Sequence, residues 1–572
     1  MTLLQALVAL PVLLPMLAAA LSVIVSRRAS LQRAVGVVTL AIVSVVAGIL
    51  LVAADRYGPV VAELGGWTPP TGIALVADRM SALLLLISTL VTLAVLVYAI
   101  DQRISDYGRD TASTTFHPIF LLLSTGVSLA YLTGDLFTMF VAFEIMLASS
   151  YVLITRRTSV SRVRSGMTYV IVSLMSSLLF LTAIGLVYAA TGTVNLAELS
   201  GRIEQLPDGL RSVLALLLVV VFGIKAAIVP LHFWLPDSYP NAPAPVTALF
   251  AGLLTKVGIY ALLRTQTLIF PQDHPSMLLL VIAAITMVVG ALGAVAQDDL
   301  NRLLSFLLVS HIGFMVFGLA IYTPEGIAGT ALYVVHHITV QATLFLVSGL
   351  ITRRTGTTSI SQMGGLARTS PWLAVLFAIP AITLAGLPPT SGFVAKLALL
   401  QAGAGAGLST EIVAGFVVLA SLLTLYAIAR VWVRVFWGTP KEPIADNDPN
   451  DELVVGTARS ARGMYVGAAS LIGVSTVIAV FAGPLSSVTA RAGEDLDTRE
   501  GYVVAVLDPG VGTGAPVTTA DAPGAPDGEG PAAPDGGEGP AVPDGGEGTA
   551  VPDGGEGTAM AEQAHGTAEV TP

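Results

Sequence analysis

Long apolar segments recur along nearly the whole chain and limit the folds that are open to it. Runs of about 20 residues, each long enough to cross a hydrocarbon core as a helix, follow one another through most of the 572 residues. Only 12% of the residues are charged, about half of the usual share in soluble domains. Backbone polar groups in a bilayer must be satisfied internally, and the runs are too long for barrel strands. The sequence therefore predicts an all-α polytopic membrane protein.

The apolar runs predict about fourteen transmembrane helices. The first run has no Lys or Arg before it, so we expect a retained span rather than a cleaved signal peptide. The expected spans are 3–25, 32–54, 79–100, 114–132, 135–155, 166–190, 210–236, 244–268, 276–296, 301–321, 327–351, 371–403, 411–436 and 463–484.

The distribution of Lys and Arg between the connecting segments predicts the orientation. Alternate segments collect 18 basic residues on one side and 5 on the other, the latter being Arg56, Arg79, Arg202, Arg211 and Arg264. Because the basic side faces the cytoplasm, we expect both termini on the outer side of a bacterial inner membrane.

The C-terminal part has a different composition. From Arg491 to Pro572 there are 16 acidic and 2 basic residues. A nine-residue repeat begins at Pro534, Pro543 and Pro552, and each copy starts with the six residues Pro-Asp-Gly-Gly-Glu-Gly. A segment this poor in large apolar residues cannot bury enough surface to fold. We expect a disordered acidic tail over 490–572.

Charged residues inside the predicted spans are the strongest functional signal. Three of the four lysines, Lys225, Lys256 and Lys396, fall within spans, and Glu144 is the one acid in the middle of a span. A lysine at bilayer depth costs about 2.5–3.5 kcal/mol on insertion scales, and such groups usually mark ion or proton paths. A structural ion pair is the competing interpretation.

Histidines and prolines extend this set. His336 and His337 are adjacent in mid-span and form a candidate proton relay, whereas a packing role is equally compatible with His232 and His311. Prolines interrupt the same two spans that carry the first and third lysines: Pro230 follows Lys225, and Pro388 and Pro389 precede Lys396. Broken helices at matching positions in two halves are typical of inverted-repeat transporters.

Four segments resemble the antiporter-like subunits that respiratory complex I shares with the Mrp cation/proton antiporters. They are TGDLFTMFVAFE at 133–144, KAAIVPLHFWLP at 225–236, DLNRLLSFLLVSHIG at 299–313 and LAGLPPTSGFVAK at 384–396. The resemblance covers residues 75–440. The sequence around 134–137 is most similar to that of the Mrp D subunits.

The resemblance implies a fourteen-helix core with two inverted five-helix repeats. The implied regions are helices 1–3 at 1–112, a first repeat at 113–270, a second at 271–440, and a cytoplasmic loop with helix 14 at 441–489. It further implies that Glu144 pairs with Lys225, that Lys256 bridges the halves, and that His337 and Lys396 continue a polar axis. Asp135 is a secondary candidate.

Two positions depart from the family pattern. Gln341 stands where many relatives have a lysine, and Asn301 stands where they have a basic residue. We therefore expect the central part of the path to pass through water or through His336 and His337.

Two functions remain open at this point. The favoured one is a proton-translocating subunit of a multisubunit Na⁺/H⁺ antiporter, a secondary transporter that works with other membrane subunits. The alternative is a proton-pumping subunit of a respiratory NADH–quinone or hydrogenase-type complex. The chain has no cysteine and no dinucleotide-binding motif, so we expect no metal and no redox cofactor in it. A purely structural scaffold is disfavoured, because it would not need three intramembrane lysines.

Overall fold

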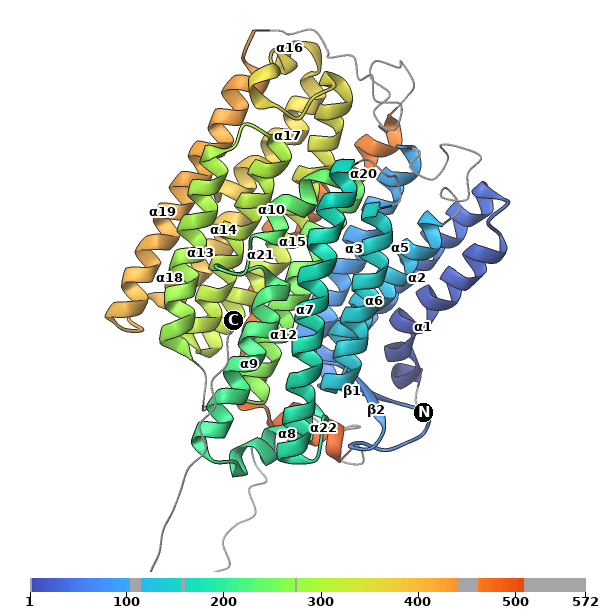
Figure 1. The fold of residues 1–572 in the computed structure, drawn as a ribbon, viewed down its shortest axis with the longest axis vertical. Coiled ribbons are helices and arrows are strands. Elements are labelled where there is room, and N and C mark those ends of the chain that lie inside the picture. Colours follow the sequence, from blue (N-terminus) through green and yellow to red (C-terminus); the bar gives the residue numbers. More distant parts are fainter. Residues whose placement is uncertain (1–2, 103–114, 156–159, 273–274, 440–460, 509–572) are drawn as a thin grey trace, which may run out of the picture. The chain divides into compact units, whose positions relative to one another are not determined.

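The computed structural model describes residues 3–102, 115–155, 160–272, 275–439 and 461–508, which fold mainly into helices (Figure 1). The elements are α1 (Leu3–Ile24), α2 (Ala29–Tyr57), β1 (Val60–Leu64), β2 (Ile73–Ala77), α3 (Arg79–Asp101), α5 (Phe116–Leu132), α6 (Leu136–Thr155), α7 (Val160–Thr191), α8 (Leu196–Arg202), α9 (Asp208–Ala226), α10 (Trp234–Ser238), α11 (Ala244–Leu249), the π-helical turn η3 (Phe250–Leu254), α12 (Thr255–Leu268), α13 (Ser276–Ala296), α14 (Leu300–Ile321), α15 (Pro324–Thr355), α16 (Leu366–Thr369), α17 (Pro371–Ala385), α18 (Ser391–Gly403), α19 (Leu408–Val431), the π-helical turn η5 (Trp432–Phe436), α20 (Arg462–Val480), α21 (Ala482–Thr498) and α22 (Glu500–Leu507). Three-residue 3₁₀ turns lie at Ile203–Gln205, Tyr239–Asn241 and Ile360–Gln362.

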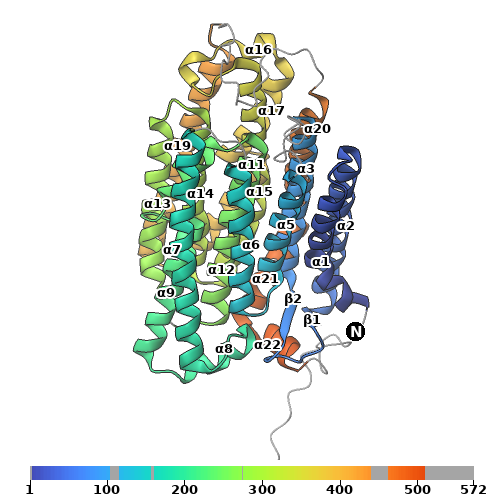
Figure 2. The same ribbon diagram turned by 45° about the vertical axis from the view of Figure 1, so that its right-hand side comes forward.

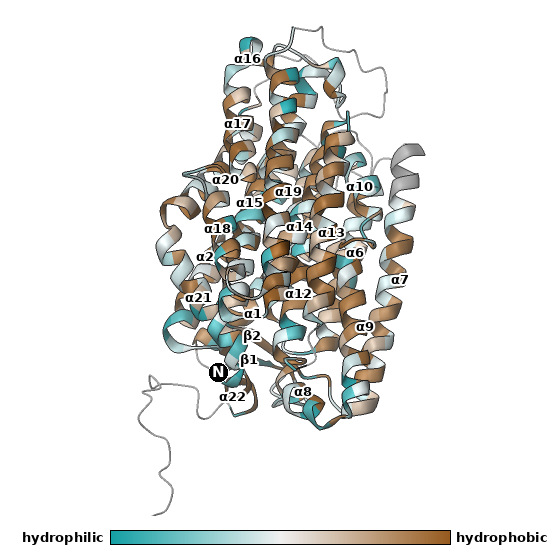
Figure 3. Ribbon diagram, turned by 90° about the vertical axis from the view of Figure 1, so that its left-hand side faces the viewer, coloured by the Kyte–Doolittle hydropathy of each residue, from teal (hydrophilic) through white to brown (hydrophobic). Residues whose placement is uncertain are grey.

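The prediction of an all-α polytopic membrane protein is confirmed. Within the described ranges, twelve helical segments are long and apolar enough to cross a membrane. Two further predicted spans coincide with shorter apolar helices, α5 and the α17–α18 pair. Figure 3 shows apolar residues along most of the length of α9 and α13. The count of fourteen crossings stays a prediction.

A short antiparallel hairpin is the one β element in the part of the chain that the structure describes. β1 and β2 pair from Val60 opposite Ala77 to Leu64 opposite Ile73. Five-residue strands are too short for their pattern to stand out between two long apolar runs, and the sequence did not predict them. Figures 1 and 2 place α8 and α22 beside the hairpin and α16 at the opposite end of this bundle. We call these the hairpin end and the α16 end.

Two helices are interrupted at the prolines noted in the sequence. α9 ends at Ala226, Ala227 takes a left-handed conformation, and a turn containing Pro230 leads to the short helix α10. α17 ends at Ala385, and α18 begins at Ser391 after the segment containing Pro388 and Pro389. Proline lacks the amide hydrogen that a helix interior requires, so the backbone carbonyls before each break become available to side chains.

Two local structures at opposite ends of the bundle have the same hydrogen-bond pattern. Segments 191–196 and 355–360 follow the long helices α7 and α15, and each pairs with an aspartate that caps another helix. Asp135 and Asp299 accept the backbone amides of the third residues of α6 and α14 at 2.6 and 2.8 Å. Isolated bridges join residues 135 with 195 and 299 with 359. The members of each pair are 60 positions apart, and the second pair follows the first by 164 positions. Two inverted repeats would produce this correspondence.

The C-terminal boundary differs from the prediction of a tail that begins at residue 490. That position lies inside α21, which packs against α15, and α22 follows it up to Leu507. The reason is local: 482–507 retains enough apolar residues for a buried face, including Ala492, Leu496 and Val506. The predicted acidic repeats lie outside the described residues.

Candidate functional site

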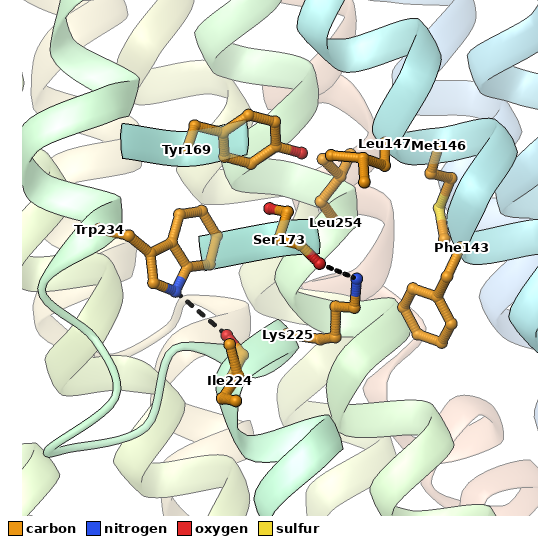
Figure 4. Close-up of a pocket in the computed structure, with 9 residues that line it drawn as sticks. All are labelled: Phe143, Met146, Leu147, Tyr169, Ser173, Ile224, Lys225, Trp234 and Leu254. Carbon is orange, nitrogen blue, oxygen red and sulfur yellow. Dashed lines mark hydrogen bonds between the residues drawn. The ribbon is translucent and has the colours of Figure 1, made fainter. Parts of the chain in front are cut away.

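Lys225 lies in the last turn of α9 and points into a small cavity (Figure 4). Its Nζ donates to the carbonyl oxygen of Ser173 at 3.4 Å and to Ser177 Oγ at 3.1 Å, both on α7. The ammonium also lies 5.4 Å from the centroid of the Phe143 ring. The cavity has a volume of about 30 Å³, which is sufficient for a water molecule. It is lined by Phe143, Met146, Leu147, Tyr169, Ser173, Ile224, Lys225, Trp234 and Leu254.

Glu144 does not form the direct ion pair with Lys225 that the family resemblance implies. No contact within 4.0 Å joins the two among the described residues, because Lys225 instead bonds to α7. Glu144 Oε1 is buried and has no hydrogen-bond partner in the described part of the chain.

Lys256 is completely buried on α12, directly after the π-helical turn η3. Its Nζ donates to the carbonyl oxygen of Ala251 at 2.5 Å. A π-helical turn displaces carbonyls from their usual partners one turn on and often occurs at functional sites. The sequence predicted the lysine but not the irregular turn that gives its ammonium an acceptor.

A cluster of aromatic and imidazole rings follows on α14 and α15. Tyr333 Oη lies 2.7 Å from His311 Nδ1, and the rings of His311 and His337 are 5.1 Å apart. Both ring nitrogens of His337 are buried without a hydrogen-bond partner among the described residues. Buried polar atoms are rarely left in this state without an ordered water or a functional reason, so His337 has capacity to accept or pass a proton.

His336 points to other partners than His337 does, as expected for neighbours on a helix. Its Nδ1 lies 2.9 Å from Ser391 Oγ, and Ser391 Oγ lies 3.2 Å from Ser475 Oγ on α20. All three residues are at most 8% exposed. The sequence missed both serines, because single hydroxyls in apolar helices usually bond to their own backbone.

Lys396 lies on α18, and its side chain reaches back across the break to the end of α17. Its Nζ donates to the carbonyl oxygens of Leu384 and Ala385 at 3.1 and 2.9 Å and lies 5.2 Å from the centroid of the Phe314 ring. The last carbonyls of a helix have no partner within it and carry partial negative charge. The broken helix therefore provides an acceptor site for a buried ammonium.

The secondary candidates have separate surroundings. Gln341 Nε2 donates to the carbonyl oxygen of Leu304 at 2.9 Å, and Asn301 Oδ1 accepts from Ser348. His232 is half-buried in the turn after Pro230. Asp135 is buried and acts as the cap of α6, which gives its carboxylate a structural task.

The structure brings some of the predicted residues together and keeps others apart. The buried rings of His311 and His337 lie 5.1 Å apart, and Phe314, which stacks on His311, also contacts the ammonium of Lys396. Lys256 and His336 are buried as well. Lys225 lines the cavity between α6, α7 and α9, whereas Glu144 on α6 is not among the lining residues. Each lysine has a carbonyl acceptor, which for Lys256 lies in an irregular turn and for Lys396 at a helix end. Such acceptors hold an ammonium without a permanent counter-ion.

The structure also pairs two charged residues that the sequence did not connect. Arg264, counted in the sequence with the outer connecting segments, is buried in α12 and forms an ion pair with Asp78 at 2.5 Å. Its position eight residues after Lys256 in one apolar run was the signal available for its burial.

Comparisons with known proteins show the family to which the chain belongs. The family model described as "NADH:quinone oxidoreductase/Mrp antiporter, TM" matches residues 133–424. The D subunit of the Na⁺/H⁺ antiporter from Alkalihalophilus pseudofirmus is 42% identical over 76% of this chain and 88% of its own length. A chain in the Mrp complex from Dietzia sp. DQ12-45-1b superimposes with a TM-score of 0.82 at 33% identity, covering 89% of this chain and 100% of that one. A chain of respiratory complex I from Thermus thermophilus gives a TM-score of 0.72 at 25% identity, covering 86% and 99%. The chain therefore belongs to the NADH:quinone oxidoreductase/Mrp antiporter family of membrane subunits and, within it, to the D-type antiporter subunits.

Proposed function

We propose that this chain moves protons through the membrane as the D-type subunit of a multisubunit Na⁺/H⁺ antiporter. The path runs through Glu144, Lys225, Lys256, the pair His336–His337, and Lys396. The observation that carries this proposal is the buried ring group on α14 and α15, in which His311 and His337 lie 5.1 Å apart and Phe314 contacts both His311 and the ammonium of Lys396. The 42% identical relative is named as a D-type antiporter subunit, which favours a transporter subunit over an enzyme.

In the proposed path, charge repulsion between neighbouring groups drives proton transfer from one group to the next. Two unit charges 4 Å apart interact by about 4 kcal/mol at an effective dielectric constant near 20. A proton that arrives at one group therefore makes a neighbouring group release its own. In this scheme a water in the Lys225 cavity connects the first two residues, and His337 takes the place of the missing lysine at Gln341.

The family also suggests how the path is placed in the fold, in the complex and in the membrane. We propose inverted repeats at 113–270 and 271–440, as the paired structures at Asp135 and Asp299 suggest. The Mrp complex similarity supports a hetero-oligomeric assembly with other membrane subunits. A bacterial inner membrane with both termini outside remains the prediction from the basic residues.

Removal of the first two groups tests the function. We expect Glu144→Ala and Lys225→Ala each to reduce Na⁺/H⁺ antiport at least about tenfold, because each interrupts the step between the cavity and Lys256. Antiport is measured in everted vesicles as sodium-induced dissipation of a pH gradient. Glu411→Gln and Arg368→Ala, at exposed positions of α19 and α16, are matched controls. Unchanged antiport in both test variants, with the complex assembled normally, would defeat the proposal.

Purification of the complex through a tag on this chain tests the alternative. Small hydrophobic membrane subunits and one larger homologous subunit are expected from an antiporter. Co-purifying flavin or iron–sulfur subunits would instead assign the same proton path to a redox pump.

A further inference from the structure

A line of polar residues runs from Lys256 along α12 to the ion pair of Arg264. Lys256, Tyr260 and Arg264 are four residues apart on α12 and so share one face. Since a helix rises 1.5 Å per residue, Arg264 lies about 12 Å farther along the axis. Tyr260 Oη donates to the carbonyl oxygen of Tyr131 at 2.7 Å, and Arg264 Nε donates to Tyr260 Oη at 3.3 Å.

The line ends at a buried ion pair at the hairpin end. Arg264 Nη2 lies 2.5 Å from Asp78 Oδ2, and the two side chains are only 2% and 7% exposed. Asp78 directly follows β2 and caps α3, accepting the backbone amide of Ser81 at 2.8 Å. Removing two charges from water is costly, and apolar packing can often replace such a pair without loss of stability. Its presence at the end of a polar line therefore points beyond stability.

Aromatic rings cover the guanidinium on two sides. Arg264 Cζ is 5.3 Å from the centroid of Tyr260 and 5.1 Å from that of Tyr502, which comes from the C-terminal helix α22. Arg264 Nη1 is buried and has no hydrogen-bond partner within the described ranges. An arginine keeps its charge in proteins, so this group cannot pass a proton on.

Ion pairs attach the preceding helix α21 to the same end of the bundle. Arg79 binds Asp495 at 2.6 Å and Asp55 at 3.0 Å, and Arg491 binds Asp55 at 2.8 Å. These contacts tie α21 to α2 and α3, and through α21 they position α22 over Arg264.

We propose that Arg264 is a barrier that prevents protons from leaving the Lys256 region through the hairpin end. Asp78 and Tyr502 are positioning residues that hold its guanidinium across the polar line. Asp78 balances the charge of Arg264, so the barrier is the guanidinium itself, which occupies this end of the line and keeps its protons. The inference rests on the proposed function: with this exit closed, protons at Lys256 are directed toward His337 and Lys396.

Passive proton leak is the direct test. The purified complex is placed in liposomes without sodium, a potassium diffusion potential is imposed, and proton entry is followed with a trapped pH dye. We expect Arg264→Gln to raise the leak about tenfold or more, since it removes the group that cannot pass a proton. Arg264→Lys keeps the positive charge but introduces an amine that can release a proton when buried, so it is expected to raise the leak as well.

A double variant separates a barrier from a structural ion pair. Asp78→Asn with Arg264→Gln removes both charges and retains an N-cap, since asparagine caps helices well. Arg264→Gln alone leaves the buried Asp78 without its partner and could fail to assemble for that reason. The double variant leaves no unpaired charge. The barrier predicts that the assembled double variant leaks; a leak at the wild-type level would overturn the proposal.

A second combination locates the leak. Adding Lys256→Met to the double variant is expected to abolish the extra leak, because the route through α12 then lacks its inner carrier. A leak that persists would place the route elsewhere and refute the barrier. Failure of the proposed function is distinguishable from failure of the barrier. It appears as unchanged sodium-driven antiport in Glu144→Ala and Lys225→Ala, and it does not depend on the leak measured without sodium.

Discussion

Loss of the hydroxyl group of Ser391 is expected to slow antiport more than loss of that of Ser475. Ser391 is the inner member of the chain His336–Ser391–Ser475, with distances of 2.9 and 3.2 Å. Ser391→Ala removes the partner of His336 Nδ1, and His336 Nε2 already has none in the described part of the chain. The imidazole is then buried without a side-chain hydrogen bond.

The structure sets the size of the two effects. A buried polar group left without its partner costs about 1–3 kcal/mol, or about 5- to 150-fold in an equilibrium. Ser391→Ala should fall in this range. Ser475→Ala removes only the longer bond and leaves Ser391 free to bond to His336, so about 0.5–1.5 kcal/mol is expected.

The assay is the initial rate of sodium-driven proton movement in everted vesicles, divided by the amount of assembled complex on native gels. Ser391→Thr, which keeps a hydroxyl group, is expected to retain most of the rate. Ser470→Ala is the matched control on α20, because Ser470 is exposed and bonds to the carbonyl of its own helix at Gly467. A wild-type rate in Ser391→Ala, or a larger loss in Ser475→Ala than in Ser391→Ala, would refute the reasoning.

Three further predictions concern stability and the C-terminus. Gly290→Ala should lower the unfolding temperature of the detergent-solubilised complex, because the added Cβ would lie 2.3 Å from the backbone nitrogen of Ser310 on α14. Such overpacking costs about 1–3 kcal/mol. An unchanged unfolding temperature would contradict the close contact between α13 and α14. Truncation after Asp508 should leave assembly on native gels and antiport intact. Truncation at Gly493 should abolish both, because it removes part of α21 and all of α22. Loss of antiport in the protein that ends at Asp508 would make the acidic tail essential. Burial opposes ionisation of Asp298, but hydrogen bonds from two serine residues outweigh it and lower its pKa, so its stabilising effect is complete above the ordinary pKa of aspartate and lost as the pH falls through the lowered value. Asp298→Asn should therefore lower the unfolding temperature at pH 7 but not at strongly acidic pH, and equal effects at both would exclude this linkage.

The sequence by itself determined where the helices lie and where two of them break. The predicted span 276–296 has the bounds of α13, and 301–321 differs from α14 by one residue. Apolar runs of this length have few alternatives in a bilayer. The breaks near Pro230 and Pro388 were equally readable, because proline acts on its own backbone. Residues with a high cost in the membrane, such as Lys256, were also identifiable from composition.

Only the tertiary structure decided which groups meet. Lys225 bonds to Ser177 on another helix instead of pairing with Glu144, and Ser391 reaches Ser475 across 84 positions of sequence. Arg264 finds Asp78 across 186 positions. Hydrophobicity specifies that a segment is buried but not its rotation or its neighbours. Those depend on how side chains pack between helices, and in this chain that packing brings the rings of His311 and His337 to within 5.1 Å of each other.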